Sequence, residues 1–372
     1  MDLKIAVLAG DGIGPEVMAQ AIKCLNAVAD TFNHSFRFTT AVIGAEAMSI
    51  SGNPLPLKTI QVCKASDAVL YGAVGHPKYD NDPTLAIRPE HGLFKLRKEL
   101  DIFANIRPVK FFPTLVKKSP LKESIISGTD FVIYRELTGG TVFGNGNFNT
   151  DATSASDVYA YTETQISRIA HLAFKAARSR RKKLTLVDKA NVFDSSKLWR
   201  KVVTKIGESY SDIELDFLYV DNAVTQIILH PTQFDVILSD TLFGDLLSNE
   251  ASVIGGSIGL LPSASVGDET AMFEPVHGSY PEAAGKNIAN PIACILSAAL
   301  LLQYFGLDEE AASVVAAVNK SMRKNIVTPD LNAKVTHTTE EVGNFIATNI
   351  VETDNYLSSN AENIGLGRST II

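Results

Sequence analysis

Residues 4–32, KIAVLAGDGIGPEVMAQAIKCLNAVADTF, decide the fold class of this chain. The stretch opens with a short apolar run, KIAVLA, which is typical of a buried strand. A glycine turn follows, and apolar residues then recur at helical spacing on one face. Pro15 suits the first helical position, and Glu16 is favoured there by the helix dipole. A strand, a tight turn and an amphipathic helix predict the first unit of an α/β protein.

The same alternation continues along the chain. Further strand-like runs, separated by helical patterns, are DAVLYGAVG (67–75), KKLTLVD (182–188), LDFLYVD (215–221) and FDVILSD (234–240). Alternation of this kind predicts layered α/β structure with substantial parallel pairing.

The glycines after the first strand do not form a dinucleotide fingerprint. That motif requires the spacing G-x-G-x-x-G, but here Gly10, Gly12 and Gly14 follow one another at every second position and Pro15 occupies the sixth. A tight strand-to-helix turn explains these glycines equally well. We therefore do not expect a classical Rossmann fold, and any dinucleotide would bind another loop.

Length and charge limit the class of protein further. At 372 residues the chain exceeds what one hydrophobic core usually holds, so two domains are expected. The net charge of −7 argues against partners that need basic patches, namely nucleic acid and an anionic membrane surface. No stretch reaches the roughly 20 apolar residues of a membrane span, and the opening apolar run is too short for a signal peptide. Cys24, Cys63 and Cys294 lie far apart, which favours reduced, buried thiols in a cytoplasmic protein.

Three arginines stand in apolar or turn sequence instead of in charge runs. Arg97 lies in LFKLRKEL, Arg107 in FANIRPVK and Arg135 in VIYRELTGG. A half-buried guanidinium needs an anionic partner, and its rigid fork matches a carboxylate. The three arginines therefore predict a small substrate with two carboxylates. In the strand around Arg135, the period of two places Tyr134 on the opposite face.

A second group of polar residues indicates a divalent metal. Asp245 and Asn249 are one helical turn apart in TLFGDLLSNEAS, and Asp221 belongs to a separate element. Such oxygen ligands could bind Mg²⁺ or Mn²⁺, with water and substrate completing the octahedron. The alternative is an ordinary helix charge and a solvated asparagine.

Two further segments could serve a dehydrogenase. Lys189, beside Asn191 in VDKANV, could act as a base if neighbouring cations or burial depress its pKa; otherwise it is an ordinary surface lysine. The loop 273–291, FEPVHGSYPEAAGKNIANP, could wrap a nucleotide. Glu282 in this loop could accept both ribose hydroxyls and would repel a 2′-phosphate, which favours NAD over NADP.

Together these segments resemble the β-decarboxylating dehydrogenases of the isocitrate/isopropylmalate family, over residues 3 to about 350. The resemblance rests on motifs that occur in order: LAGDGIGPEV, YGAVGHPKYDND, RPEHGLFKLRKELDIFANIRPVK, RELTGG, VDKANV, FDVILSDTLFGDLLSNEAS, GLLPSAS and EPVHGSYPEAAGKNIANP. It implies two α/β domains that share a mixed sheet. The implied segments are 1–102 with 255–357 on the cofactor side, 103–254 as the central domain, a dimerisation arm at about 141–162, and a disordered tail at 358–372.

The resemblance also implies an activity. Members of the family oxidise a 2-hydroxy acid with NAD and Mg²⁺ or Mn²⁺ and then lose the β-carboxylate. This chain is most similar to the branch that converts 3-isopropylmalate to 4-methyl-2-oxopentanoate in leucine biosynthesis. Homodimers with shared active sites are implied, in which the partner subunit provides a lysine and an aspartate.

Roles for individual residues follow from the same motifs. The implied substrate-binding residues are Arg97, Arg107, Arg135, Leu93, Phe94 and Val192. The implied catalytic positions are Lys189, Asp221 and Val142. The implied cofactor-binding residues are Glu90, Asn191, Gly278, Ser279, Glu282, Lys286 and Asn290. The implied metal ligands are Asp221, Asp245 and Asn249.

The residues facing the γ-substituent bear on the choice of substrate. Leu93, Phe94 and Val192 form an apolar set that suits an isopropyl group and would leave a third carboxylate unpaired, which argues against isocitrate. Because Phe94 is larger than the leucine usual in the family, another alkylmalate is an alternative substrate, as is tartrate.

Several positions depart from the family pattern. Val142 stands where the general-acid tyrosine is expected, and valine cannot donate a proton; Tyr159 and Tyr161 remain as substitutes. Loss of one positioned acid typically costs about 10²–10⁴-fold in rate. Asn249 replaces an aspartate, so it brings an oxygen ligand without charge. A catalytically weak enzyme, or a homologue that only binds ligand, is therefore the second alternative.

Overall fold

The computed structural model describes residues 1–80, 87–141, 147–148, 153–334 and 337–351. The strands are β1 (Asp2–Gly10), β2 (Ser35–Thr40), β3 (Ala68–Ala73), β4 (Ile102–Lys110), β5 (Asp130–Glu136), β6 (Asn147–Phe148), β7 (Ala155–Ser156), β8 (Lys183–Asp188), β9 (Glu214–Tyr219), β10 (Val236–Ser239), β11 (Pro262–Gly267) and β12 (Ala271–Pro275). The helices are α1 (Gly14–Phe32), α2 (Gly44–Ser51), α3 (Leu57–Lys64), α4 (Pro77–Asp80), α5 (Pro89–Glu99), α6 (Glu123–Ile126), α7 (Glu163–Ser179), α8 (Asp194–Gly207), α9 (Val220–Leu229), α10 (Thr241–Gly255), α11 (Ile292–Tyr304), α12 (Asp308–Arg323) and α13 (Thr339–Ala347).

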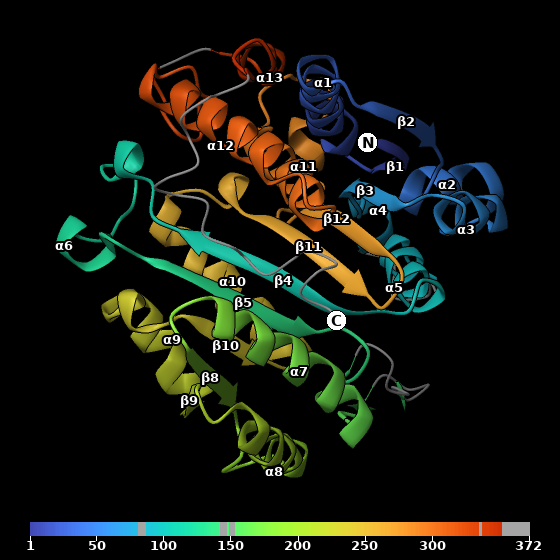
Figure 1. The fold of residues 1–372 in the computed structure, drawn as a ribbon. Coiled ribbons are helices and arrows are strands. Elements are labelled where there is room, and N and C mark those ends of the chain that lie inside the picture. The colour runs from blue at the N-terminus through green and yellow to red at the C-terminus, as the bar shows by residue number, and fades with distance from the viewer. Residues whose placement is uncertain (81–86, 142–146, 149–152, 335–336, 352–372) are drawn as a thin grey trace.

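One mixed sheet of ten strands runs through the molecule, in the order β2-β1-β3-β12-β11-β4-β5-β10-β8-β9 (Figure 1). The strands at both ends pair in parallel, as the alternation of strands and helices predicted. In the centre, β11 pairs antiparallel with β12 and with β4, and β4 pairs antiparallel with β5. This antiparallel centre separates the fold from a classical Rossmann sheet, in agreement with the prediction.

The halves of the sheet come from different parts of the sequence. Strands β2, β1, β3, β12 and β11 lie within the two segments expected on the cofactor side, and β4 opens the central segment. The pairing of β11 with β4 joins the halves into one continuous sheet, so the shared sheet is confirmed.

Helices cover both faces of the sheet (Figure 1). On one face a single large core holds residues from α1, α7, α8, α11, α12 and α13. The other face carries two smaller cores, one with α3 and α5 over the first half and one with α9 and α10 over the second. Because the two small cores are separate, the middle of that face is not filled by apolar side chains.

The glycine turn after β1 requires close backbone approach. Gly10 and Gly12 have φ values of +71° and +60°, and a Cβ at either position would clash with a carbonyl oxygen, that of Ala73 or of Ser279 respectively. The turn therefore needs glycine for packing reasons. Ser279, whose carbonyl oxygen lies against Gly12, belongs to the loop expected to bind a nucleotide.

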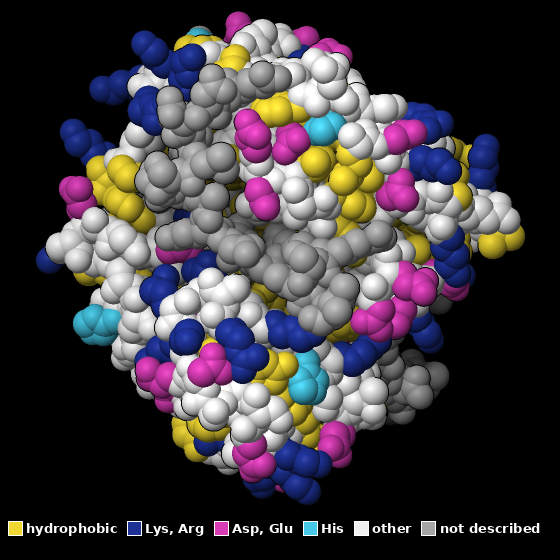
Figure 2. Space-filling view, in the orientation of Figure 1, with side chains coloured by type: hydrophobic (Ala, Val, Ile, Leu, Met, Phe, Trp, Pro, Cys, Tyr) yellow, Lys and Arg dark blue, Asp and Glu magenta, His cyan; other side chains and the backbone are white. Residues whose placement is uncertain are grey.

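Other features of the chain agree with its composition. The three cysteines are free and buried, and burial raises the pKa of Cys24 and of Cys63 to about 12. No helix within the described residues combines the length and the apolar character that a membrane span requires. Acidic and basic side chains are interspersed on the face shown in Figure 2.

The expected arm contains the antiparallel pair β6–β7, whereas Val142 and the expected tail lie outside the described residues.

Candidate active site

A polar row crosses the middle of the sheet, on the face between the two small cores. On β5, Phe131 and Ile133 belong to one small core, whereas Tyr134 belongs to the large core on the opposite face. The period of two therefore places Arg135 on the face of the small cores, as the sequence predicted. The same alternation on β4 separates Arg107 from Ile106, which lies in the large core.

Two of the arginines meet at one carboxylate. Nη1 of Arg107 lies 3.0 Å from Oδ1 of Asp245, and Nη1 of Arg135 lies 2.6 Å from the same oxygen. Arg135 also donates through Nε to the backbone oxygen of Thr241, at 2.7 Å. Asp245 comes from α10, which packs over β4 and β5, so the helix brings the acid to both strands.

These guanidinium groups have little contact with solvent. Only 7% of the Arg107 side chain and 14% of the Arg135 side chain are exposed. Burial lowers the pKa of Arg107, although Asp245 opposes the shift. Burial, and next the charge of Arg107, lower the pKa of Arg135. Two enclosed cations that share one carboxylate oxygen form a site that attracts a further anion.

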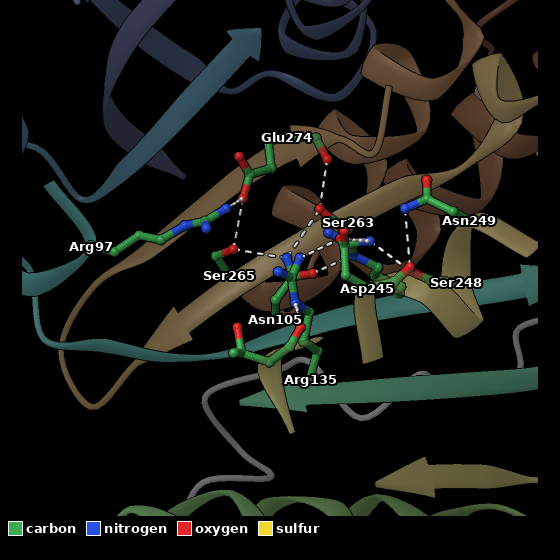
Figure 3. Close-up of polar contacts among 11 residues, drawn as sticks. Arg97, Asn105, Arg135, Asp245, Ser248, Asn249, Ser263, Ser265 and Glu274 are labelled. Carbon is green, nitrogen blue, oxygen red and sulfur yellow. Dashed lines mark hydrogen bonds and ion pairs between the residues drawn. The ribbon is translucent and has the colours of Figure 1, made fainter. Parts of the chain in front are cut away.

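Arg97 reaches the same sheet face from α5. Its Nη2 lies 2.7 Å from Oε1 of Glu274 on β12, and both side chains are buried (Figure 3). The Nε of Arg97 is buried without a partner among the described residues. An unpartnered buried donor is costly, so an acceptor that arrived there would be favoured.

The expected metal ligands fall into two groups. Asp245 uses Oδ1 for the arginines, and no described residue donates to its Oδ2. Asn249 donates through Nδ2 to the backbone oxygen of Asp245, at 3.0 Å, which leaves its Oδ1 as an available ligand oxygen. Asp221 instead accepts a hydrogen bond from Lys189, at 2.6 Å. Within the part of the chain that is described, no three His, Cys, Asp or Glu side chains come together as a possible metal site.

Lys189 and Asp221 form a pair on the outer strands of the second half. The hydrogen bond from Lys189 lowers the pKa of Asp221, whose side chain is 66% exposed. Asn191 and Val192 follow Lys189 in a turn and are exposed as well. No hydrogen bond or ion pair between described residues joins this pair to the arginines. The pair therefore presents a second set of polar groups on an open surface.

The expected apolar pocket is likewise divided. Leu93 is buried in the small core of the first half, and Phe94 beside it is half-buried. Val192 is 60% exposed and belongs to none of the buried clusters. The structure of one chain does not bring these three side chains together.

Two of the residues expected at the cofactor, Glu90 and Ser279, form a cradle around Gly75. A Cβ on Gly75 would lie 2.9 Å from Oε1 of Glu90 and 3.4 Å from Oγ of Ser279, so both side chains converge there. A Cβ on Gly278 would meet nothing within 4 Å. Two expected cofactor residues of the same loop, Glu282 and Lys286, are exposed.

Asn290 differs from the other expected cofactor residues because the nitrogen and the oxygen of its side-chain amide both bond to protein. Its Nδ2 donates to Asp330 at 3.0 Å, and its Oδ1 accepts from the backbone of Ile292 at 3.0 Å. These contacts anchor the start of α11.

Several residues of the site were missed in the sequence. The carboxylate of Glu16 accepts hydrogen bonds from the backbone N–H groups of Gly285 and Asn287, so the first helix holds the loop after β12. The Nε2 of His277 in that loop is buried without a partner among the described residues. On the sheet, Asn105 and Glu274 link the arginines. The sequence signal that could have indicated Asn105 and Glu274 is a polar residue at alternate positions of a strand that is otherwise apolar.

An α/β protein with a mixed sheet and an enclosed arginine cluster belongs to the class of enzymes that act on small carboxylic acids. Residues 4–346 match the model of the isocitrate/isopropylmalate dehydrogenase family, and the chain belongs to this family. The resemblance inferred from the motifs is thereby confirmed.

Relatives and solved structures agree with this assignment. The chain is 49% identical over 348 residues to a 3-isopropylmalate dehydrogenase of Bacteroides fragilis, which covers 93% of this chain and 98% of the relative. A 3-isopropylmalate dehydrogenase of Bacillus subtilis is 50% identical over 337 residues, with 89% and 92% covered. The crystal structure of an isocitrate dehydrogenase from Methylococcus capsulatus superposes with a TM-score of 0.84 at 32% identity, covering 94% of this chain and 99% of the other.

Proposed function

We propose that the chain catalyses the NAD-dependent oxidative decarboxylation of 3-isopropylmalate to 4-methyl-2-oxopentanoate, a step of leucine biosynthesis, in the cytoplasm. The observation that carries the proposal is the set of Arg97, Arg107 and Arg135, which come from three elements and have side chains at most 14% exposed. Their rigid forks match the two carboxylates of a malate derivative. The relatives named 3-isopropylmalate dehydrogenase support this substrate.

In the proposed reaction, different residues of the chain bind the substrate and transfer the proton. The arginines bind and orient the two carboxylates, and Lys189 takes the proton from the substrate hydroxyl. NAD supplies the acceptor for the hydride that leaves the hydroxyl carbon, and the divalent cation supplies an electrophile for the oxidised oxygen. The bond to the β-carboxylate then breaks, CO₂ leaves, and the carbon takes up a proton. Val142 cannot deliver that proton, so we expect this last step to be slow.

The candidate ligands fit a hard divalent cation. Asp245 offers Oδ2 and Asn249 offers Oδ1, both oxygens on one helical turn, and Mg²⁺ and Mn²⁺ prefer oxygen. In the proposed dimer, Asp221 of one subunit would bind the cation of the other subunit. This explains why Asp221 lies apart from Asp245 and Asn249 within one chain. Because Asn249 is neutral, the cation should bind less tightly than to three carboxylates.

The loop after β12 fits a dinucleotide. Gly278 leaves open space for a ligand, and the buried, unpartnered Nε2 of His277 offers a polar group. The exposed carboxylate of Glu282 favours the free ribose hydroxyls of NAD. Glu90 lies on the other side of the cradle around Gly75, where the nicotinamide ribose would lie.

We further propose that the protein is a homodimer and that each half of the sheet is a domain. Leu242 and Leu246 are exposed one turn apart on α10, and Leu229 is exposed on the neighbouring helix α9. Exposed leucines on adjacent helices are typical of a subunit interface. A second copy seated there would bring Lys189 and Val192 of one subunit to the arginines and Leu93 of the other.

An assay of NADH formation with 3-isopropylmalate and Mn²⁺ tests the function, with 4-methyl-2-oxopentanoate identified as the product. We expect turnover by the unchanged chain and a faster rate for Val142→Tyr. If neither protein forms NADH while both are folded dimers, the catalytic proposal is wrong. Calorimetry that shows dicarboxylate binding without turnover would instead establish a binding homologue.

A substrate panel tests the apolar pocket. We expect kcat/KM to be higher for 3-isopropylmalate than for malates with a smaller alkyl group and far higher than for tartrate, because hydroxyl groups would lose hydrogen bonds against Leu93 and Phe94. Preference for tartrate would contradict the assignment of these residues.

A further inference from the structure

The polar row on the sheet contains residues for which the proposed chemistry gives no role. Register places Ser263 on β11 opposite Glu274 on β12, and Ser265 opposite Asn105 on β4. Asn105 in turn lies opposite Arg135 on β5. Polar side chains thus follow one another across four strands. All but Arg135 are at most 6% exposed, and the apolar side chains of the two small cores flank them on this sheet face.

Hydrogen bonds connect this row without a break (Figure 3). Oε1 of Glu274 accepts a hydrogen bond from Oγ of Ser265 at 2.8 Å. Ser265 in turn accepts from Nδ2 of Asn105, also at 2.8 Å. The same Nδ2 lies 3.2 Å from Oγ of Ser263. The side chains of Ser263, Ser265 and Asn105 are therefore satisfied by one another and by Glu274 within the buried row.

Each end of this hydrogen-bonded chain holds a buried arginine. Oε1 of Glu274, which accepts from Ser265, also accepts from Nη2 of Arg97 at 2.7 Å. At the other end, Oδ1 of Asn105 accepts from Nε of Arg107 at 2.5 Å. A single chain of bonds therefore runs from Arg97 on α5 to Arg107 on β4.

We propose that Glu274, Ser265 and Asn105 form one positioning unit, which fixes Arg97 and Arg107 relative to each other for dicarboxylate recognition. This role rests on the proposed function, because it assigns the two arginines to one substrate. None of the three residues needs to touch the substrate. They act through the arginines, so they are positioning residues and not catalytic ones.

The physical reason lies in the length of the arginine side chain. An arginine has several rotatable bonds, and ordering it costs conformational entropy when a ligand binds. A guanidinium that is already held by a buried acceptor has lost this freedom beforehand, and its remaining N–H groups keep one direction. The unit also crosses the pairing of β11 with β4, where the two halves of the sheet join. It therefore fixes the spacing of two arginines that belong to different halves.

A double-mutant cycle on Arg97→Lys and Glu274→Gln tests the unit through steady-state kinetics. Glu274→Gln keeps the size of the side chain and removes its charge. We expect the KM for 3-isopropylmalate to rise about 10-fold, with the KM for NAD unchanged and a smaller effect on kcat. In the Arg97→Lys background the same change should cost less than about 2-fold, because Glu274 acts through Arg97. Effects that multiply independently would overturn the proposal.

Glu310→Gln is the matched control. Glu310 is also a buried carboxylate, paired with His34 at 2.6 Å on the large-core side of the sheet. Its replacement should lower the melting temperature without changing either KM. If it raised the KM for 3-isopropylmalate as much as Glu274→Gln does, the effect would be a general loss of packing, and the positioning role would be refuted. Ser265→Ala, which removes one hydroxyl, serves if Glu274→Gln does not fold.

A measurement without substrate separates this inference from the proposed function. In protein labelled with ¹⁵N-arginine, we expect Glu274→Gln and Ser265→Ala each to shift the Nε–H resonance of Arg107, although neither residue forms a hydrogen bond with Arg107. Such shifts would support the unit even if the chain formed no NADH. An Arg107 resonance unmoved in both variants would show that no unit exists, whatever the activity.

Discussion

At the scale of single residues, one departure from the expected family pattern, Asn249, lies on α10. Asn249 is placed to offer one neutral oxygen beside the carboxylate of Asp245, and Thr241 at the helix start accepts from Arg135 through its backbone. In the proposed metal site, the helix would thus offer two oxygen ligands that carry one negative charge between them. The charge of the ligand set can be changed without altering its shape.

Asn249→Asp should tighten binding of the divalent cation. The added carboxylate keeps the position of the ligand and contributes a full charge, so the Kd for Mn²⁺ should fall by about 10-fold. Titration with Mn²⁺, followed by electron paramagnetic resonance, measures this. Asn26→Asp on the exposed face of α1 adds the same charge elsewhere and should leave the Kd unchanged. Equal affinities for Asn249→Asp and the unchanged chain would exclude position 249 as a ligand.

Asp240 should make the stability of the fold depend on pH. Burial raises the pKa of Asp240 to about 6, from an ordinary value of 3.8. The folded state binds this proton more tightly than the unfolded state does, so protonation of Asp240 stabilises the fold. The stabilisation is complete below pH ~3.8 and is lost as the pH rises through about 6. Asp240→Asn keeps an N-cap acceptor for Phe243 without the charge.

The stability of Asp240→Asn relative to the unchanged chain should therefore improve by about 2 kcal/mol from pH ~4.5 to pH ~7.5. Urea unfolding of both proteins across this range gives the difference. A difference that is constant with pH would show that Asp240 titrates normally in the folded protein.

At the scale of elements, α1 and the turn before it hold the loop 273–291 by hydrogen bonds. The carboxylate of Glu16 binds two backbone N–H groups of the loop, and the backbone of Ile13 donates to Ser279 at 2.8 Å. The glycine turn therefore helps to position a loop more than 260 residues further along the chain, which we propose as the NAD site. This explains the turn without any direct contact between its glycines and phosphate.

Glu16→Ala should loosen the loop and weaken NAD binding. Two charge-assisted hydrogen bonds are lost, so we expect the KM for NAD to rise about 10-fold while the KM for 3-isopropylmalate stays constant. Steady-state kinetics with each substrate varied in turn measures both constants. Glu46→Ala, an exposed acid in the first turn of α2, is the control. If Glu16→Ala changed only the KM for 3-isopropylmalate, the loop after β12 would not be the NAD site.

The elements also show what the sequence could and could not predict. The strands β1, β3, β5, β8, β9 and β10, the helix α1 and the face of Arg135 follow from local periodicity, and all are confirmed. The row from Glu274 to Asn105 depends on the register between β12, β11 and β4. Strand β4 lies more than 150 residues before the other two in the sequence. Register between distant strands is fixed by tertiary packing, so no local pattern predicts it. For the same reason the separation of Lys189 and Asp221 from the arginines became visible only in the structure.

At the scale of the whole molecule, one chain carries the proposed active-site groups in two separate sets. The arginines and Asp245 lie on the sheet face between the small cores, whereas Lys189, Asp221 and Val192 lie on an open surface. A homodimer that seats α10 against its copy would complete both sets by one symmetric contact. Activity should therefore depend on association.

Leu246→Asp should separate the subunits. A charge at the centre of an apolar interface is costly, so the mass measured by light scattering should fall by half, and kcat should fall by about 100-fold or more as Lys189 is lost. Ile50→Asp changes another exposed apolar side chain, on α2, and should leave both mass and activity unchanged. A monomer that retained full activity would show that each chain holds a complete site.

A crystal structure of the protein with 3-isopropylmalate and Mn²⁺ would locate the substrate. We predict its two carboxylates within hydrogen-bonding distance of Arg97, Arg107 and Arg135, with the isopropyl group against Leu93. Density for the ligand at any other place, with the three guanidinium groups still bonded only to protein, would contradict the function proposed for this chain.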